Sequence, residues 1–148
     1  MGSLLNVTIV LYSLGLLHSI FGFYRKRQAF VRIALGMVAC GFLCHTAFLV
    51  SLGVSRGHFP VTNLPESLSF FAWCISLTFI AANLRYRLYV LGAFVLPLVS
   101  LLTIGSQVLW EENHAIPPSL RSGWVYFHSR IAYLAYAAFF LTFVCAIL

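Results

Sequence analysis

Five long apolar segments, separated by short polar connections, constrain the fold of this chain more than any other feature. They cover residues 4–23, 30–54, 67–84, 88–110 and 123–148. Each is close to the ~20 residues that an α-helix needs to cross a bilayer. A membrane interior offers no water to bond exposed backbone groups, so a spanning segment of this kind must be helical. The sequence therefore predicts an all-α polytopic transmembrane bundle of about five spanning helices.

The composition argues against a soluble domain. Of the 148 residues, 61% are apolar and 8% are charged, and the mean hydropathy is +0.96. A soluble domain carries charge on about a quarter of its residues. We therefore expect residues 1–148 to form a single transmembrane domain in contact with membrane lipid. The net charge of +6 then reports membrane topology, and no nucleic-acid partner is expected.

The basic residues indicate how the chain is oriented in the membrane. Six of the nine flank the first and third connections, and three lie toward the opposite end with all three acidic residues. Cytoplasmic connections are enriched in Lys and Arg. We therefore expect the N-terminus and the second and fourth connections outside, with the chain in a bacterial inner membrane. The first group is Arg25, Lys26, Arg27, Arg32, Arg85 and Arg87; the second is Arg56, Arg121 and Arg130, with Glu66, Glu111 and Glu112.

The second connection ends in a helix-start signal. Asn63 is a favoured N-cap residue, and Pro65 suits a first helical turn. Glu66 stands three residues after the cap, where the acid of a capping box reaches back to the backbone. This pattern predicts that the third helix begins here. An alternative role for Glu66 is to orient His58 or a ligand at the outer rim.

Five histidines in so apolar a chain are its main chemical anomaly. Ionisable side chains within spans are costly and tend to face the bundle interior or a water-filled cavity. Neutral imidazole is well suited to be an axial ligand of haem iron. His128 is the strongest candidate, because it lies near the outer start of the last segment, beside Trp124 and Tyr126. Arg130 either snorkels toward water or pairs with an anion such as a haem propionate.

The other histidines have plainer alternatives. His45, near the middle of the second segment, is either an intramembrane ligand or a partner in an interhelical hydrogen bond. An interhelical hydrogen bond also explains His18. His58 and His114 lie in connections, where a solvated histidine needs no ligand. If His58 met His128 across the two outer connections, the pair could hold one haem from both sides.

The sequence offers little to an enzyme that hydrolyses or transfers groups. It contains no Ser/His/Asp set, no paired carboxylates, no phosphate-binding loop and no zinc-site spacing. Its four cysteines, Cys40, Cys44, Cys74 and Cys145, lie in apolar segments, where free cysteine packs as a small hydrophobe. We therefore expect the chain not to be an enzyme by itself.

Three stretches together point to a family. The first is GHFPVTNLPESL at residues 57–68, which continues into Phe71-Ala72-Trp73. The second is LGAFVLPL at residues 91–98. The third combines LRSGW at residues 120–124 with His128 and with YLAYAAF at residues 133–139. This combination resembles the CcsA (ResC) branch of the cytochrome c assembly proteins.

The resemblance implies a function in system II cytochrome c biogenesis. Members of that family carry haem to the outer face of the membrane and present it to apocytochrome c. By this resemblance His128 corresponds to an outer-side histidine that holds haem, and we expect it to be an axial ligand of haem b. In the site that we expect around it, Trp124 and Tyr126 form the wall and Arg130 neutralises a propionate. His58 and His45 are further cofactor-binding candidates. A ResB-type (Ccs1) membrane subunit and apocytochrome c are the implied partners, and the assembled complex would be the haem-attaching synthase.

The resemblance also implies that the chain is the N-terminal part of a longer protein. Two other functions remain open at this point. One is a HemX-like, non-catalytic membrane protein that regulates haem biosynthesis. The other is a transporter or redox fragment whose histidines relay protons, although a relay predicts more intramembrane acids than the sequence contains.

Overall fold

The computed structural model describes residues 2–88, 90–110 and 123–148. These residues form five α-helices that are long and apolar enough to cross a membrane, and they contain no strand. This confirms the predicted all-α polytopic membrane fold, and each helix overlaps one of the five predicted segments. The helices are α1 (Gly2–Arg25), α2 (Gln28–Arg56), α3 (Leu64–Tyr86), α4 (Leu91–Val108) and α5 (Gly123–Ile147).

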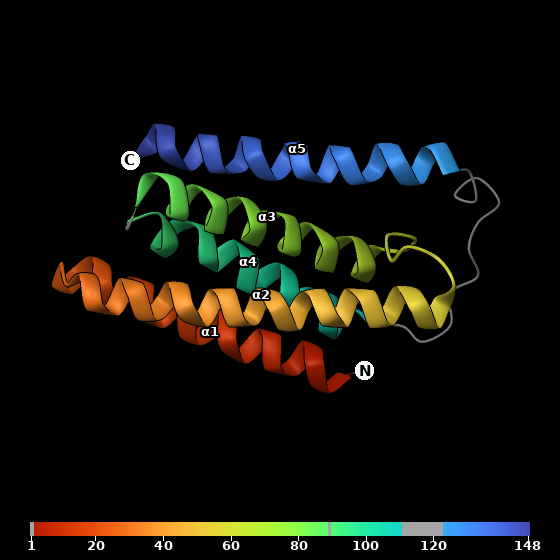
Figure 1. Ribbon diagram of the computed structural model, residues 1–148, viewed down its shortest axis with the longest axis horizontal. Coiled ribbons are helices and arrows are strands. Elements are labelled where there is room, and N and C mark those ends of the chain that lie inside the picture. The colour runs from red at the N-terminus through yellow and green to blue at the C-terminus, as the bar shows by residue number, and fades with distance from the viewer. Residues whose placement is uncertain (1, 89, 111–122) are drawn as a thin grey trace.

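The helices run side by side along the long axis of the molecule (Figure 1). Helix α1 packs against α2 and α4, while α3 packs against α2, α4 and α5. The start of α1, the end of α2 and the starts of α3 and α5 lie at one end of the bundle. We call this the loop-two end, after the connection at residues 57–63 (loop two). The topology thus brings His58 and the segment around His128 to the same end.

Most of the buried core lies among the first four helices. Helix α5 lies along one side, chiefly against α3, and only 17% of its most apolar window is buried, compared with 28–44% for the other helices. Ala137 and Val144 are its buried apolar residues. Much of α5 therefore remains exposed along its length. The largest fully buried side chains include Tyr12, Phe48, Leu5, Leu52, Ile75, Leu96, His45 and Glu66.

Small residues allow α1 to approach both of its neighbours closely. A Cβ atom added at Gly15 would lie 2.8 Å from Val38 Cγ2 on α2, and one added at Gly92 of α4 would lie 2.6 Å from Ser19 Oγ on α1. Gly15, Ser19 and Gly92 are all buried. Between helices in lipid, association depends strongly on van der Waals contact, which small residues make possible. The position of α1 is therefore set by contacts that larger side chains would prevent.

The close approach can be tested by enlarging Gly15. We expect Gly15→Val to lower the free energy of unfolding by about 1–3 kcal/mol, the usual cost of overpacking a tight contact. The free energy of unfolding is measured by denaturing the purified chain in detergent while its tryptophan fluorescence is monitored. Gly36→Val is the matched control, because a Cβ at exposed Gly36 meets nothing within 4 Å. Equal destabilisation by both substitutions would contradict the packing argument.

Candidate functional site

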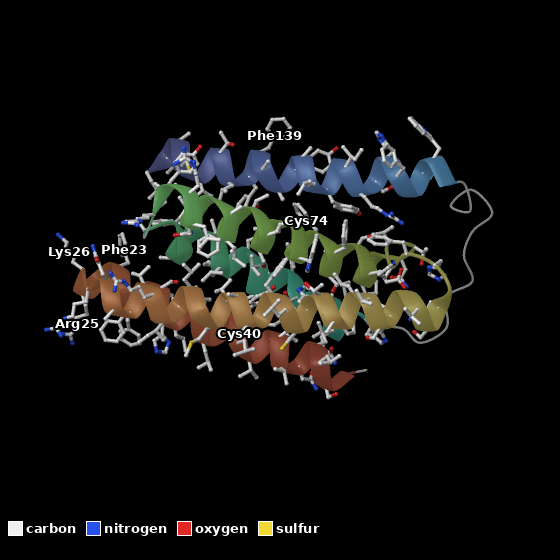
Figure 2. All side chains as sticks on the ribbon, in the orientation of Figure 1. Phe23, Arg25, Lys26, Cys40, Cys74 and Phe139 are labelled. Carbon is white, nitrogen blue, oxygen red and sulfur yellow. The ribbon has the colours of Figure 1, made fainter. Side chains whose placement is uncertain are left out.

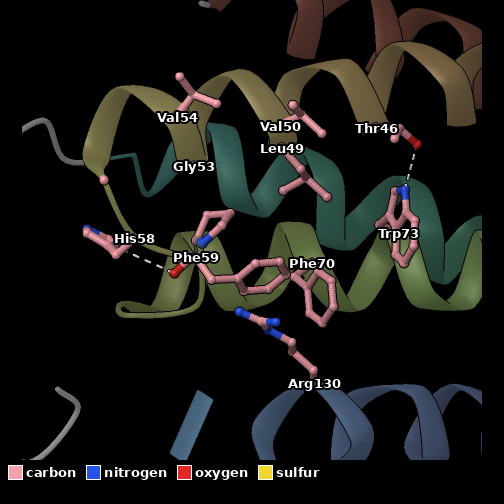
Figure 3. A pocket seen from close by; sticks show the side chains of 12 residues that line it. Thr46, Leu49, Val50, Gly53, Val54, His58, Phe59, Phe70, Trp73 and Arg130 are labelled. Carbon is pink, nitrogen blue, oxygen red and sulfur yellow. Dashed lines mark hydrogen bonds between the residues drawn. The ribbon is translucent and has the colours of Figure 1, made fainter. Parts of the chain in front are cut away.

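An open groove lies at the loop-two end, between α2, loop two, α3 and α5 (Figure 3). Its volume is about 590 Å³, which falls within the roughly 300–1,000 Å³ of typical ligand sites. Its walls are mostly apolar, with charged or titratable side chains only toward the loop-two end. The lining residues are Thr46, Leu49, Val50, Gly53, Val54, Gly57, His58, Phe59, Pro60, Phe70, Trp73 and Arg130.

Aromatic rings form one wall of this groove. The ring centroids of Phe59 in loop two and Phe70 in α3 are 5.0 Å apart in an edge-to-face arrangement. Phe70 in turn stacks on Trp73, one turn further along α3, at 5.7 Å. Trp73 also stacks on Phe42 of α2 at 5.2 Å. Such ring pairs add specific geometry to apolar burial, so the wall has a defined shape that links loop two to α2 and α3.

The inner end of the groove is closed to polar ligands. The Trp73 Nε1–H donates to Thr46 Oγ1 at 2.8 Å, and the Thr46 hydroxyl donates to the carbonyl oxygen of Phe42 at 2.7 Å. Figure 3 shows the Trp73–Thr46 bond at the end away from His58. These polar groups satisfy one another, as groups removed from water generally must. The inner end therefore presents apolar surface to any occupant.

Arg130 reaches from α5 toward the groove (Figure 3). Its Cζ atom lies 3.8 Å from the centroid of the Phe59 ring, which is a close cation–π contact. Within the part of the chain that the structure describes, the ion pair joins Arg56 to Glu66, and Arg130 has no acidic partner. Among the described residues, therefore, no acidic side chain neutralises the positive charge that Arg130 places at the loop-two end of the groove.

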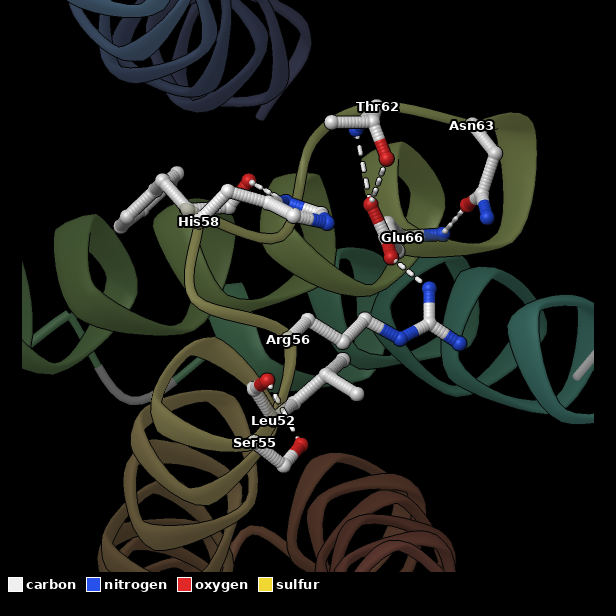
Figure 4. Close-up of polar contacts among 8 residues, drawn as sticks. Leu52, Ser55, Arg56, His58, Thr62, Asn63 and Glu66 are labelled. Carbon is white, nitrogen blue, oxygen red and sulfur yellow. Dashed lines mark hydrogen bonds and ion pairs between the residues drawn. The ribbon is translucent and has the colours of Figure 1, made fainter. Parts of the chain in front are cut away.

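A buried carboxylate holds loop two in place (Figure 4). Glu66 is completely buried, and its Oε1 accepts a hydrogen bond from Arg56 Nη1 at the end of α2. Its Oε2 accepts from the backbone N–H of Thr62 at 2.7 Å and from the Thr62 hydroxyl at 2.8 Å. One side chain thus ties α2, loop two and α3 together. The Arg56 guanidinium also lies 5.2 Å from the Trp110 ring centroid.

The geometry confirms the predicted helix cap. Asn63 has an extended backbone, and its Oδ1 accepts a hydrogen bond from the Glu66 N–H at 2.9 Å. The Glu66 carboxylate reaches back to Thr62, one residue before the cap. Its Oε1 is bound by Arg56 and its Oε2 by Thr62, whereas His58 Nδ1 lies 3.2 Å from the Phe59 carbonyl oxygen. The structure therefore favours the capping role of Glu66 over the orientation of His58.

His45 lies in the interior of the bundle and is 0% exposed. Its Nε2 is 2.9 Å from Ser69 Oγ on α3, and its Nδ1 is 3.3 Å from the Tyr12 hydroxyl on α1. Both ring nitrogens therefore have partners, and the predicted interhelical hydrogen bonding is present. Coordination of iron by His45 would require one of these bonds to break. Its role as an intramembrane ligand stays a prediction.

His18 does not line the groove. His18 Nδ1 lies 2.9 Å from the carbonyl oxygen of Leu14, so its described hydrogen bond is within α1, whereas an interhelical one was expected. His114 and the side chain of Tyr126 lie outside the described residues.

His128 and Trp124 lie on a different side of α5 from Arg130. Successive residues of an α-helix are about 100° apart, so residues 128 and 130 point roughly 200° apart around the axis. His128 is exposed and does not line the groove. Trp124 is 72% exposed, and its ring lies 6.1 Å from that of Phe127. The groove therefore brings His58 and Arg130 together, but it does not include His128.

Sequence reasoning missed the aromatic wall of the groove. Phe70 and Trp73 are three residues apart in α3, a spacing that places two side chains on one helix face. This spacing was the available signal for the α3 part of the wall. Nothing local places Phe59 or Phe42 against it, because those contacts depend on loop two and on the packing of α2.

This fold defines an integral membrane protein, an α-helical bundle whose groove and exposed histidine lie toward one end. The chain is 29% identical to the cytochrome c biogenesis protein CcsA of Gloeobacter violaceus, over 78% of this chain and 35% of that protein. It is 30% identical to CcsA of Phalaenopsis aphrodite, over 92% of this chain and 42% of the relative. It is 33% identical to CcsA of Prochlorococcus marinus, over 91% of this chain and 41% of that protein.

The chain belongs to the CcsA family of cytochrome c biogenesis proteins. It spans about two fifths of the length of the curated relatives it matches. No family model and no solved structure matches it.

The Arg56–Glu66 pair provides a test of how loop two is held. We expect Glu66→Gln to lower the free energy of unfolding by about 3 kcal/mol, because it leaves the Arg56 charge without its partner. Arg56→Leu should destabilise the chain by a similar amount, since it leaves the buried Glu66 carboxylate without its cationic partner. In a double-mutant cycle, the double variant should lose less free energy of unfolding than the two single variants lose in sum. Additive losses, measured by denaturation in detergent, would show that the two side chains act independently.

Proposed function

We propose that this chain handles haem during cytochrome c maturation, with His128 as an axial ligand of haem b at the loop-two end. Membership of the CcsA family supports the process. The observation that supports His128 as the ligand is that its imidazole is available to bind iron. Three of the described histidines, His18, His45 and His58, each have a ring nitrogen within hydrogen-bonding distance of another protein group. His128 is exposed and has no hydrogen bond to the described part of the chain.

The surroundings of His128 suit a flat, mostly apolar ligand. Trp124 lies one helical turn before it, and Phe127 is 55% exposed beside it. Haem, when bound, supplies an iron that accepts an axial imidazole nitrogen. In this proposal His128 holds the iron and Trp124 covers one part of the macrocycle. Arg130 is not assigned to a propionate here, because it lies on a different side of α5.

The proposal includes partners and a location. A ResB-type (Ccs1) subunit and apocytochrome c are the proposed partners, and a bacterial inner membrane with loop two on the outer face is the proposed location. The exposed face of α5 is compatible with further contacts, since Phe139 and Phe143 are 71% and 62% exposed. In this assignment haem attachment is an activity of the assembled complex, to which this chain contributes a ligand.

A haem spectrum tests the assignment of His128. The chain is purified in detergent as wild type, His128→Ala and His18→Ala, and haem is quantified in each sample. We expect a Soret band in the wild type that is lost or becomes high-spin in His128→Ala. His18→Ala is the matched control, because His18 bonds within α1 and does not line the groove. It should retain the wild-type spectrum.

Two results would contradict the proposal. An unchanged low-spin spectrum in His128→Ala would move the ligand to another residue, and His45→Ala and His58→Ala would then identify it. A folded wild-type chain without haem would favour the HemX-like alternative, in which this part of the protein serves as a scaffold.

Labelling of introduced cysteines tests the proposed orientation. Leu64 at the start of α3 is 61% exposed, and Gln28 at the start of α2 is also exposed. In intact cells, a membrane-impermeant maleimide should label Leu64→Cys and should reach Gln28→Cys only after permeabilisation. The unsubstituted chain, whose cysteines lie within apolar segments, controls for background labelling. The reverse pattern would invert the topology.

A further inference from the structure

The groove at the loop-two end has features that haem ligation by His128 does not use. It is long and apolar, it has a cation at one end, and it does not include His128. We infer that it binds one acyl chain of an anionic glycerophospholipid, with the headgroup phosphate against Arg130. This assignment does not depend on the proposed haem site, because the two use different sides of α5.

The charge at the mouth of the groove indicates an anionic headgroup. The Arg130 guanidinium is held over the Phe59 ring at 3.8 Å, and it has no acidic partner within the described ranges. Stacking on a ring face leaves the N–H groups at the guanidinium edge available to donate. Arginine donors bind phosphate oxygens through charge-assisted hydrogen bonds. Arg56, at the end of α2, is already paired with Glu66, so among the described lining residues Arg130 supplies the arginine that can bind an anionic occupant.

The inner part of the groove indicates a hydrocarbon tail. Thr46 and Trp73 bond to each other, and Thr46 also bonds to the Phe42 carbonyl oxygen. A ligand with a carbonyl or hydroxyl group at that depth would find no free donor among the described lining residues, and an unsatisfied polar group is costly away from water. An acyl chain has no such group. The inner end thus selects an apolar tail over a quinone ring or a polar solute.

The shape of the groove is maintained by its walls. Phe59, Phe70 and Trp73 contact one another in series, and Gly53 on α2 presents no side chain to the groove. A Cβ at Gly53 would make ordinary contacts of 3.6 Å with the His58 carbonyl oxygen and with Pro60 Cδ. Gly53 can therefore be enlarged without a backbone clash, and a longer side chain there should occupy the groove. This makes Gly53 a suitable site for a blocking substitution.

The test uses Trp73 as a reporter of the groove. The chain contains three tryptophans, so Trp110→Phe and Trp124→Phe leave Trp73 alone. The protein is placed in unlabelled phosphatidylcholine bilayers with a minor fraction of acyl-brominated phosphatidylglycerol or acyl-brominated phosphatidylcholine. Bromine quenches tryptophan on contact. We expect half-maximal quenching at a roughly tenfold lower fraction of phosphatidylglycerol, the factor that one charge-assisted contact can supply.

Two variants, each with a matched control, locate the site. Arg130→Gln should remove the preference for phosphatidylglycerol, whereas Arg87→Gln, an exposed arginine at the other end of the bundle, should retain it. Gly53→Leu should reduce quenching by both lipids, and exposed Gly36→Leu should not. Equal quenching by the two lipids in the single-tryptophan chain without further substitutions would overturn the inference. An absence of quenching by either lipid, as expected if another protein segment fills the groove, would overturn it as well.

Haem measurements keep this inference separate from the proposed function. His128→Ala should lose haem ligation and retain the lipid preference. Arg130→Gln should retain haem ligation and lose the lipid preference. If Arg130→Gln lost haem while its lipid preference was unchanged, Arg130 would belong to the haem site and the lipid assignment would be wrong.

Discussion

The buried carboxylate of Glu66 determines the arrangement of the end of the bundle where the candidate sites lie. A carboxylate in a membrane protein interior is costly unless charge and hydrogen bonds compensate for it, and here Arg56 and Thr62 provide both. These partners come from the end of α2 and from loop two, while Glu66 itself belongs to the first turn of α3. Phe59, which lies between the two partners in sequence, is thereby positioned against Phe70 and under Arg130. The shape of the groove therefore depends on the contacts that hold this connection.

The fold was predictable because its main determinants are local. A span must satisfy its own backbone, so length and hydropathy were enough to place five helices. The cap at Asn63 was equally accessible, since a capping signal involves only a few consecutive residues. The partners of His45 were not accessible in this way. Its hydrogen bonds reach Tyr12 and Ser69, which are 33 and 24 residues away, and nothing in the local sequence couples these positions.

The candidate site was predicted only in part, because hydropathy gives the depth of a residue and not the direction it faces. His128, Arg130 and Trp124 were correctly expected near the start of the last helix. Their directions depend on which face of α5 meets α3, and that face is fixed by contacts such as Tyr133 against Phe70. Arg130 is one turn before Tyr133 and shares its face, while His128 does not. Residues that seemed to form one site from their positions in the sequence therefore belong to two surfaces.

The small residues of α1 also bear on the order in which the bundle can assemble. Gly15 fits against Val38, and Gly41 of α2 accommodates Tyr12, and the α1–α2 contact needs only the first two helices, which end at Arg56. A short basic turn at residues 26–27 joins the two helices. This hairpin can pack while the later helices are still being synthesised, since domains and their parts generally fold from the N-terminus during translation. Ser19 of this hairpin is then in place for Gly92 to pack against, so that α4 packs on a surface that has already formed.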